Sequence, residues 1–282
     1  MSKRFNWRFY VAAVLVQMFS LLVPVPSAAQ QSRITLSTPE QIEAEFGSVP
    51  CKNEERLDAV KSLFLKMGAL PSEVSTGEFE NVENLIIRKE GTSKELIVLG
   101  AHYDKVPDGC GALDNWTGIV TLAHVYKSLK NVPLEKTLLF VAFGKEEKGL
   151  IGSRAMAAAI PKDQVAHYCA MINVDSLGLA APQVDDSVSS ASLEALAADL
   201  AREMKIPFGH ARIPNAMADS IPFLAKKIPA VTLHGMTNEW PKILHSRWDQ
   251  PAKVKPESVY LGYRLALAMV NRMDGSSCSA FR

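Results

Sequence analysis

Short apolar runs alternate with helical patterns along most of the chain. The apolar runs have the length and composition of buried strands and lie at residues 95–100, 136–143, 168–174 and 228–233. Apolar side chains recur at helical spacing over residues 119–129, 149–160, 192–204 and 256–272. Buried strands that alternate with helices predict an α/β protein whose sheet is covered by helices on both faces.

The region before these strands predicts two helices and one more strand. Thr38, followed by proline and glutamate, has the preferences of a helix start. A second helix with one apolar face is expected over residues 54–67, and a strand over residues 82–89. We expect residues 180–190 and 238–244 to be surface loops, because neither stretch has a regular apolar pattern.

The first 29 residues have the three parts of a secretory signal peptide. Basic residues precede an apolar stretch at 9–23, and the small residues Ser27, Ala28 and Ala29 supply a cleavage site. An uncleaved membrane anchor is the disfavoured alternative, because the apolar stretch is short for a span. We therefore predict cleavage after Ala29, export to the periplasm or the medium, and no stable membrane anchor afterwards.

The mature chain, residues 30–282, is predicted to be one nearly neutral domain. The sequence has 31 basic and 30 acidic residues, and three of the basic ones lie in the leader, which leaves 28 against 30 and a net charge of −2. So small a charge does not favour nucleic acid or an anionic membrane as a partner. The length suits one large core, and the sequence does not disclose the oligomeric state.

All four cysteines lie in the mature part of the chain: Cys51, Cys110, Cys169 and Cys278. An exported chain with an even number of cysteines is expected to form disulfides. Three pairings are possible, and the sequence does not choose among them. No cysteine has a neighbour at CxxC spacing, so a structural zinc knot is not expected.

Several acidic and histidine side chains follow the predicted strands. His102 and Asp104 follow the first run, Glu146 and Glu147 follow the second, and Asp175 ends the third. Open α/β sheets bind ligands at the carboxyl ends of their strands, so these residues are expected to meet at one edge. Taken singly, each has a common structural alternative, such as a charged first helical turn for the glutamate pair.

Asp114 and His245 complete the candidate set. Asp114 precedes a predicted helix, where it is either a simple N-cap or a carboxylate that bridges two cations. His245 lies in a loop before the last helix. Two imidazoles and three carboxylates can hold two divalent cations if one carboxylate bridges, and a fourth carboxylate beside a ligand can act as a base. This combination predicts metal-assisted hydrolysis.

Other residues near these motifs are candidates for the substrate side. His234 follows the fourth strand and either packs in the core, which is favoured, or lines a pocket. Trp240 and Trp248 are expected to pack, with a pocket wall as the alternative.

The motifs resemble those of the co-catalytic zinc aminopeptidases of peptidase clan MH, family M28, over roughly residues 50 to 272. The matching pieces are Gly100–Asp104, Gly111–Gly118, Glu146–Ser153, Asn173–Asp175, His245-Ser246, and the segment from Ala218–Phe223 to Ile228–Ala230. The resemblance implies a mixed, mostly parallel sheet of about eight strands between helices, the hydrolase-like fold of zinc exopeptidases. It also implies peptide substrates with a free N-terminus.

The resemblance also implies roles for the candidate residues. One zinc ion (Zn2+) would be held by His102, Asp114 and Asp175, and a second by Asp114, Glu147 and His245. Glu146 would be the general base, and Asp104 would orient His102. Co2+ or Mn2+ can replace zinc at nitrogen and oxygen ligands.

Two positions depart from the family pattern. Leu244 stands where the family often has a tyrosine before the last histidine, and Ser220 stands where it has a histidine after Asp219. Both changes lie on the substrate side, so they leave the preferred N-terminal residue and the rate open.

Two alternative functions remain on the same scaffold. One is a single-zinc enzyme similar to the glutaminyl cyclases, disfavoured because the set that includes His102, Asp175 and Asn115 is complete. The other is a non-catalytic binding ectodomain. It is disfavoured because such proteins typically lose ligands or the base, whereas all of these residues are present here. A metal count separates the first alternative from the aminopeptidase, and a turnover assay separates the second.

Overall fold

The structure is a computed structural model that describes residues 34–79 and 81–282. The signal peptide expected over residues 1–29 lies outside the described residues. Within the described ranges, every helix is too short or too polar to cross a membrane.

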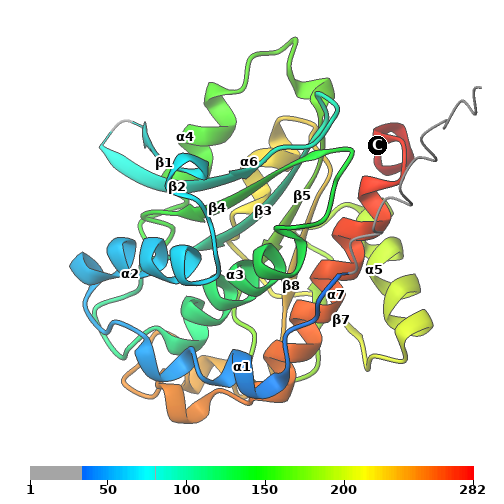
Figure 1. Cartoon of the computed structure of the whole chain (residues 1–282). Coiled ribbons are helices and arrows are strands. Elements are labelled where there is room, and N and C mark those ends of the chain that lie inside the picture. Colours follow the sequence, from blue (N-terminus) through cyan, green and yellow to red (C-terminus); the bar gives the residue numbers. More distant parts are fainter. Residues whose placement is uncertain (1–33, 80) are drawn as a thin grey trace, which may run out of the picture. The chain divides into compact units, whose positions relative to one another are not determined.

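An eight-stranded sheet forms the centre of the molecule, in the order β1-β2-β4-β3-β5-β8-β6-β7 (Figure 1). The strands are β1 (Val74–Phe79), β2 (Val82–Lys89), β3 (Leu96–His102), β4 (Thr137–Phe143), β5 (Tyr168–Val174), β6 (Gln183–Asp185), β7 (Gly209–Ala211) and β8 (Ala230–His234). Strands β4, β3, β5 and β8 are parallel to one another. Strands β2 and β6 add antiparallel to either side of this centre, so the expected mixed, mostly parallel sheet is confirmed.

Helices pack on both faces of the sheet, as Figure 1 shows. They are α1 (Pro39–Glu43), α2 (Asn53–Lys66), α3 (Thr117–Leu129), α4 (Ile151–Ala159), α5 (Ala191–Met204), α6 (Ser220–Ala225) and α7 (Pro256–Asp274). Short helical turns are η1 (Phe46–Ser48), η2 (Pro71–Glu73), η3 (Ala112–Trp116), η4 (Val165–His167), η5 (Trp240–Lys242), η6 (Pro251–Lys253) and η7 (Cys278–Phe281). One face carries α2, α3, α5 and α7, and the other carries α4 and α6.

Each face of the sheet has its own apolar layer because successive strand side chains point to opposite faces. In β3, Ile97 and Leu99 enter the larger layer, which includes the buried sides of α3 and α7. Val98, between them in sequence, enters the smaller layer with Met156 of α4 and Phe223 of α6. A strand buried on both sides must be apolar throughout, which is why these strands are continuous apolar runs in the sequence.

The longer helices and strands lie within a few residues of the predicted positions, but three strands and one short helix were not predicted. These are β1, β6, β7 and α6. The expectation that residues 180–190 form a surface loop is wrong in part, because β6 lies there and buries Val184 and Asp185. Three-residue strands show too little periodicity to be recognised, and β6 is fixed by its pairing with β8.

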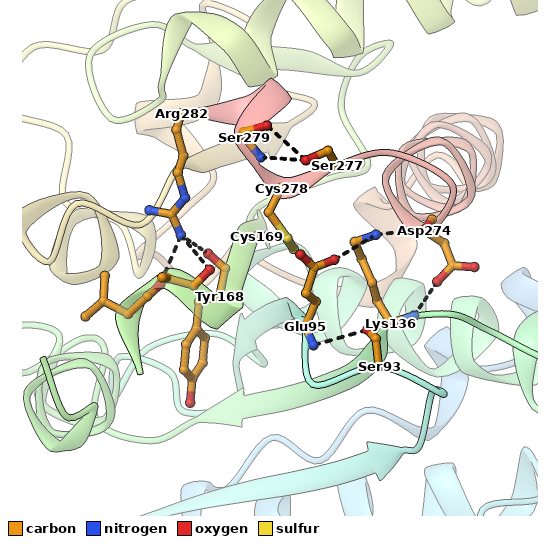
Figure 2. The surroundings of a disulfide bond; sticks show 12 residues. Ser93, Glu95, Lys136, Tyr168, Cys169, Asp274, Ser277, Cys278, Ser279 and Arg282 are labelled. Atoms are coloured by element: carbon orange, nitrogen blue, oxygen red, sulfur yellow. Dashed lines mark hydrogen bonds and ion pairs between the residues drawn. A yellow bond between two sulfur atoms is a disulfide. The ribbon is translucent and has the colours of Figure 1, made fainter. Parts of the chain in front are cut away.

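Two disulfides pair the four cysteines. Cys51 is joined to Cys110, and Cys169 is joined to Cys278. Figure 2 shows the second bond, which connects β5 to η7 at the end of the chain. Close to it, the guanidinium of Arg282 donates hydrogen bonds to carbonyl oxygens around the start of β5. The C-terminus is thus fastened to the sheet by covalent and polar contacts.

Candidate active site

The ends of three parallel strands carry four of the candidate side chains. His102 is the last residue of β3 and lies in register with Phe143, the last residue of β4. Glu146 and Glu147 follow β4 within a few residues, and Asp175 directly follows β5. Because β4, β3 and β5 are adjacent and parallel, these residues meet at one edge of the sheet, as predicted.

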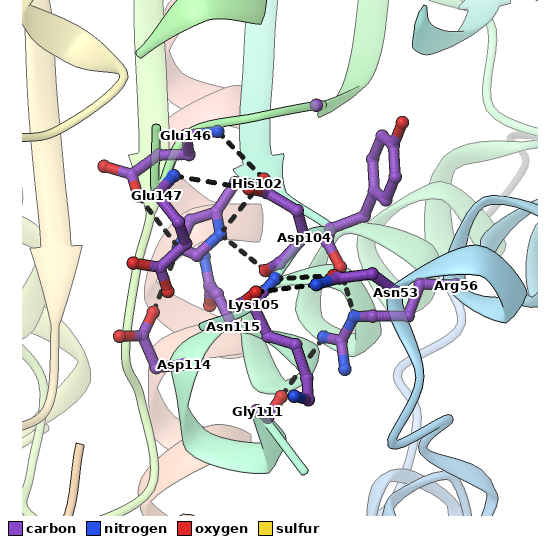
Figure 3. A network of polar contacts seen from close by, with 12 residues as sticks. Asn53, Arg56, His102, Asp104, Lys105, Gly111, Asp114, Asn115, Glu146 and Glu147 are labelled. Carbon is purple, nitrogen blue, oxygen red and sulfur yellow. Dashed lines mark hydrogen bonds and ion pairs between the residues drawn. The ribbon is translucent and has the colours of Figure 1, made fainter. Parts of the chain in front are cut away.

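A tight turn after β4 sets the direction of the two glutamates. Lys145 and Leu150 on either side of them have φ values of +56° and +61°, in the left-handed region that non-glycine residues seldom adopt. The main-chain N–H groups of Glu146 and Glu147 donate to the carboxylate of Asp104, at 2.9 and 3.3 Å (Figure 3). Asp104 therefore fixes the turn from the neighbouring strand.

Asp104 also lies beside His102, the residue that the resemblance expects it to orient. The Nδ1 atom of His102 lies 3.1 Å from the main-chain carbonyl oxygen of Asp104 and 3.9 Å from its carboxylate. The carbonyl is thus the closer partner of the ring, since the carboxylate is occupied by the glutamate turn.

The loop that carries Asp114 is held by two polar side chains. Asp249 accepts hydrogen bonds from the main-chain N–H groups of Leu113 (2.7 Å) and Asp114 (3.1 Å). Asn115 donates to the carbonyl of Val174, at the end of β5, at 2.8 Å. Asp249 therefore positions the Asp114 loop.

Asp114 stands between the two histidines. Its Oδ1 atom lies 3.0 Å from Nε2 of His102, and its Oδ2 atom lies 3.0 Å from Nε2 of His245. His102 also faces Asp175 at 3.6 Å, and His245 faces Glu147 at 3.3 Å. The other four predicted metal ligands are thus gathered around the carboxylate of Asp114, with a histidine and a further acid on each side.

Glu146 lies next to these five residues but is not one of the predicted ligands. Its carboxylate is 4.0 Å from His102. The pKa of Glu146 is raised to about 10, mainly by burial and in part by nearby carboxylates, while His102 acts to lower it. Burial likewise raises the pKa of Glu147 to about 7, with Asp114 as the next cause.

The same crowding of acids also raises the pKa values of the two histidines, because it stabilises their charged form. Burial would lower the pKa of His102, but Glu146, Asp114 and Asp175 outweigh it and raise that pKa well above its ordinary value. The hydrogen bond to Asp114 raises the pKa of His245 to about 9. Burial would raise the pKa of Asp114, yet its hydrogen bonds to both histidines hold it below the usual range.

This group of side chains fits divalent cations. One ligand atom each from His102, Asp114 and Glu147 lies within 4.8 Å of the others. The Oε1 atom of Glu147 is buried and has no hydrogen-bond partner among the described residues. Buried carboxylates that outnumber their cationic partners are costly unless positive charge compensates them. Imidazole and carboxylate ligands suit zinc.

A cavity of about 410 Å³ opens in front of this group. Its wall includes Trp240, Leu244 and His234, so Trp240 and His234 face a pocket where packing was the favoured expectation. Trp248 is 51% exposed and contributes nothing to the wall that the described residues form. The buried Asp185 of β6 also lines the cavity and was missed, because its strand was not recognised.

A buried arginine behind the site was also missed. Arg56 of α2 is fully buried and donates to the main-chain oxygens of Tyr103, Cys110 and Gly111, which belong to the loops that carry the candidate ligands (Figure 3). In the sequence it is one charged residue on an amphipathic helix, which is ordinarily solvated. No pattern in the sequence distinguishes it.

The chain belongs to peptidase family M28, whose sequence model matches residues 84–270. It is similar to Aminopeptidase YwaD of Bacillus subtilis, with 31% identity over 124 residues, which are 44% of this chain and 26% of that protein. The matched part therefore spans about a quarter of the length of such curated relatives.

Solved structures share the fold. The zinc aminopeptidase BSAP from Bacillus subtilis superposes with a TM-score of 0.62 and 22% identity, over 71% of this chain and 52% of that one. A glutaminyl cyclase from an Acidobacteriales bacterium superposes with a TM-score of 0.72 and 19% identity, over 89% of this chain and 98% of that one. The expected fold of zinc exopeptidases is confirmed.

Proposed function

We propose that this protein is an exported metallo-aminopeptidase that binds two zinc ions. One ion would be held by His102, Asp114 and Asp175, and the other by Asp114, Glu147 and His245. The observation that carries the proposal is Asp114, whose two carboxylate oxygens each lie 3.0 Å from a different histidine. A carboxylate in this position is suited to bridge two cations.

The residues around these ligands would supply the remaining chemistry. Zinc at this site would polarise the scissile carbonyl and lower the pKa of a water molecule towards neutrality. Glu146 lines the cavity and belongs to neither set of proposed ligands. Bound cations would lower its pKa, so that its carboxylate could take a proton from the attacking water and pass it to the leaving amine. Asp104 would orient His102, and its carboxylate would keep Glu146 in place by accepting a hydrogen bond from the main-chain N–H of Glu146.

The acidic surroundings support a substrate with a free α-amino group. An ammonium group is stabilised beside Glu146, Glu147 and Asp175, whereas an internal peptide bond brings no such charge. Peptides with a free N-terminus are therefore the proposed substrates. The name of the relative Aminopeptidase YwaD agrees with this. We further propose that residues 1–29 are a signal peptide, that residues 30–282 form the mature peptidase domain, and that Co2+ or Mn2+ can replace zinc.

Hydrolysis of aminoacyl-nitroanilides tests this proposal. The wild-type protein should release nitroaniline, EDTA should abolish the activity, and Glu146→Gln should lower kcat by roughly 10²- to 10⁴-fold without loss of zinc. Glu55→Gln on the exposed side of α2 is the matched control and should retain full activity. Activity that survives both EDTA and Glu146→Gln contradicts the proposal. Ring closure of N-terminal glutaminyl peptides in place of hydrolysis favours the glutaminyl cyclase alternative.

A further inference from the structure

The cavity in front of the candidate site is lined by several apolar side chains as well as by the candidate ligands and a few other polar residues. The apolar lining residues include Val188, Ile213, Met236, Trp240 and Leu244. His234, the last residue of β8, lines the same cavity and also a second one beside it. A side chain that entered the cavity would thus have apolar groups and the imidazole of His234 among its neighbours.

His234 is buried but unpaired. Only 2% of it is exposed, and neither ring nitrogen has a hydrogen-bond partner of good geometry among residues 34–79 and 81–282, although the main chain of Val184 lies near the ring. Of the polar side chains that line the cavity there, His234 and Glu147 alone have such buried, unpaired atoms. Thr232, by contrast, lies 2.8 Å from the hydroxyl of Ser220. An unpaired buried polar group is costly, so a polar group on the occupant of the cavity would relieve this cost.

The charges around His234 restrict which kind of substrate side chain can bind beside it. Burial lowers the pKa of His234, and the carboxylates of Asp185 and Asp175 only partly offset this, so the ring is neutral near pH 7. A neutral imidazole has one nitrogen that donates and one that accepts. An acidic side chain is disfavoured, because Asp185 and Asp175 line the same cavity and like charges repel.

We propose that His234 determines specificity by binding a neutral hydrogen-bonding group at the end of the substrate's N-terminal side chain, with tyrosine as the best fit. This inference rests on the proposed aminopeptidase function. Tyrosine has an apolar ring for the apolar walls and a hydroxyl that can donate to and accept from the imidazole. A site built to pair with a hydroxyl discriminates strongly against the analogue that lacks it.

Tyrosyl and phenylalanyl nitroanilides test the proposal, since they differ by one hydroxyl. The wild-type protein should favour the tyrosyl substrate in kcat/KM by about tenfold or more. His234→Phe should remove this preference, and His234→Gln, which keeps a donor and an acceptor, should retain most of it. A wild-type preference for the phenylalanyl or a lysyl substrate overturns the proposal, as does a preference that is unchanged in His234→Phe.

A binding experiment tests the preference for tyrosine over phenylalanine without turnover. Calorimetry measures how tightly the hydroxamates of the two amino acids bind to the zinc-loaded protein. The tyrosine compound should bind about tenfold more tightly to the wild-type protein and equally to His234→Phe. If no nitroanilide is hydrolysed but this ratio holds, the proposed function fails while the role of His234 stands. Equal binding of both compounds to the wild-type protein overturns the role of His234.

Discussion

At the scale of single residues, two charged side chains in the interior explain how the site is held. Asp249 fixes the Asp114 loop by accepting hydrogen bonds from its main-chain N–H groups. Arg56 donates hydrogen bonds to main-chain carbonyl oxygens at the start of the same loop. Burial lowers the pKa of Arg56 to about 10, while Asp104 and Asp249 act to raise it, so the guanidinium stays charged. The acids of the site and this buried cation therefore stabilise each other.

Arg56→Met should weaken both the fold and metal binding. The change leaves the carbonyl oxygens of Tyr103, Cys110 and Gly111 without their donor, so the loops should lose their fixed position. We expect the free energy of unfolding to fall by about 3 kcal/mol and zinc affinity to fall by roughly tenfold or more. Urea unfolding and zinc titration against a competing chelator measure these effects. Arg88→Met, at a half-exposed arginine, is the control, and equal zinc affinity in both variants would contradict this role.

His124 makes the stability depend on pH. Its ring is buried in α3, with Nδ1 2.7 Å from the hydroxyl of Ser37, and burial lowers its pKa to about 4. The unfolded chain binds a proton near pH 6.5, so it binds more protons than the folded state between pH 6.5 and 4. Lower pH in this window therefore destabilises the fold, by about 3 kcal/mol in total. His124→Gln should lose this component, and identical pH profiles of unfolding in variant and wild type would refute it.

At the scale of elements, the parallel order of β4, β3 and β5 assembles half of the site, and loops supply the rest. The strand ends were predictable, because apolar runs mark the strands and parallel strands share an edge. The positions of Asp114 and His245 relative to them were not, because they depend on contacts between distant residues such as Asp249 and Leu113. The resemblance to a known family indicated that Asp114 and His245 share one site with the strand-end residues. The disulfide pairing was also beyond reach, since each bond joins segments far apart in the chain.

The two disulfides should differ in their effect on the site. Cys51–Cys110 fastens the loop before Asp114 to the start of α2, whereas Cys169–Cys278 holds only the C-terminus against β5. Replacing either pair by alanine should cost about 2–4 kcal/mol of stability. Only the Cys51→Ala/Cys110→Ala protein should lose zinc affinity, by roughly tenfold. Equal zinc titration curves for the two double variants would show that the first bond does not position the site.

At the scale of the whole molecule, the sheet concentrates negative charge at one edge of a nearly neutral chain. The formal net charge is +1 for the full sequence, yet five carboxylates line the cavity together with His102, His234 and His245. Folding must bring these carboxylates together, so a cation that binds only the folded state stabilises it.

Removal of metal should therefore lower the melting temperature. A ligand at a thousand times its Kd contributes about 4 kcal/mol, which for a domain of this size corresponds to a shift of roughly 10 °C. Differential scanning calorimetry with and without EDTA measures the shift, and added zinc should reverse it. A melting temperature that is insensitive to EDTA and zinc would mean that the acidic cluster binds no cation in the folded protein.

The most direct test of the central claim is the zinc content of the purified protein, measured by elemental analysis for wild type, Glu146→Gln and Asp114→Ala. If Asp114 bridges two ions and Glu146 is only a base, the wild type and Glu146→Gln should each hold about two zinc ions per chain and Asp114→Ala should hold fewer than one. A wild-type content of one zinc ion or none, or an Asp114→Ala protein that still holds two, would contradict the account.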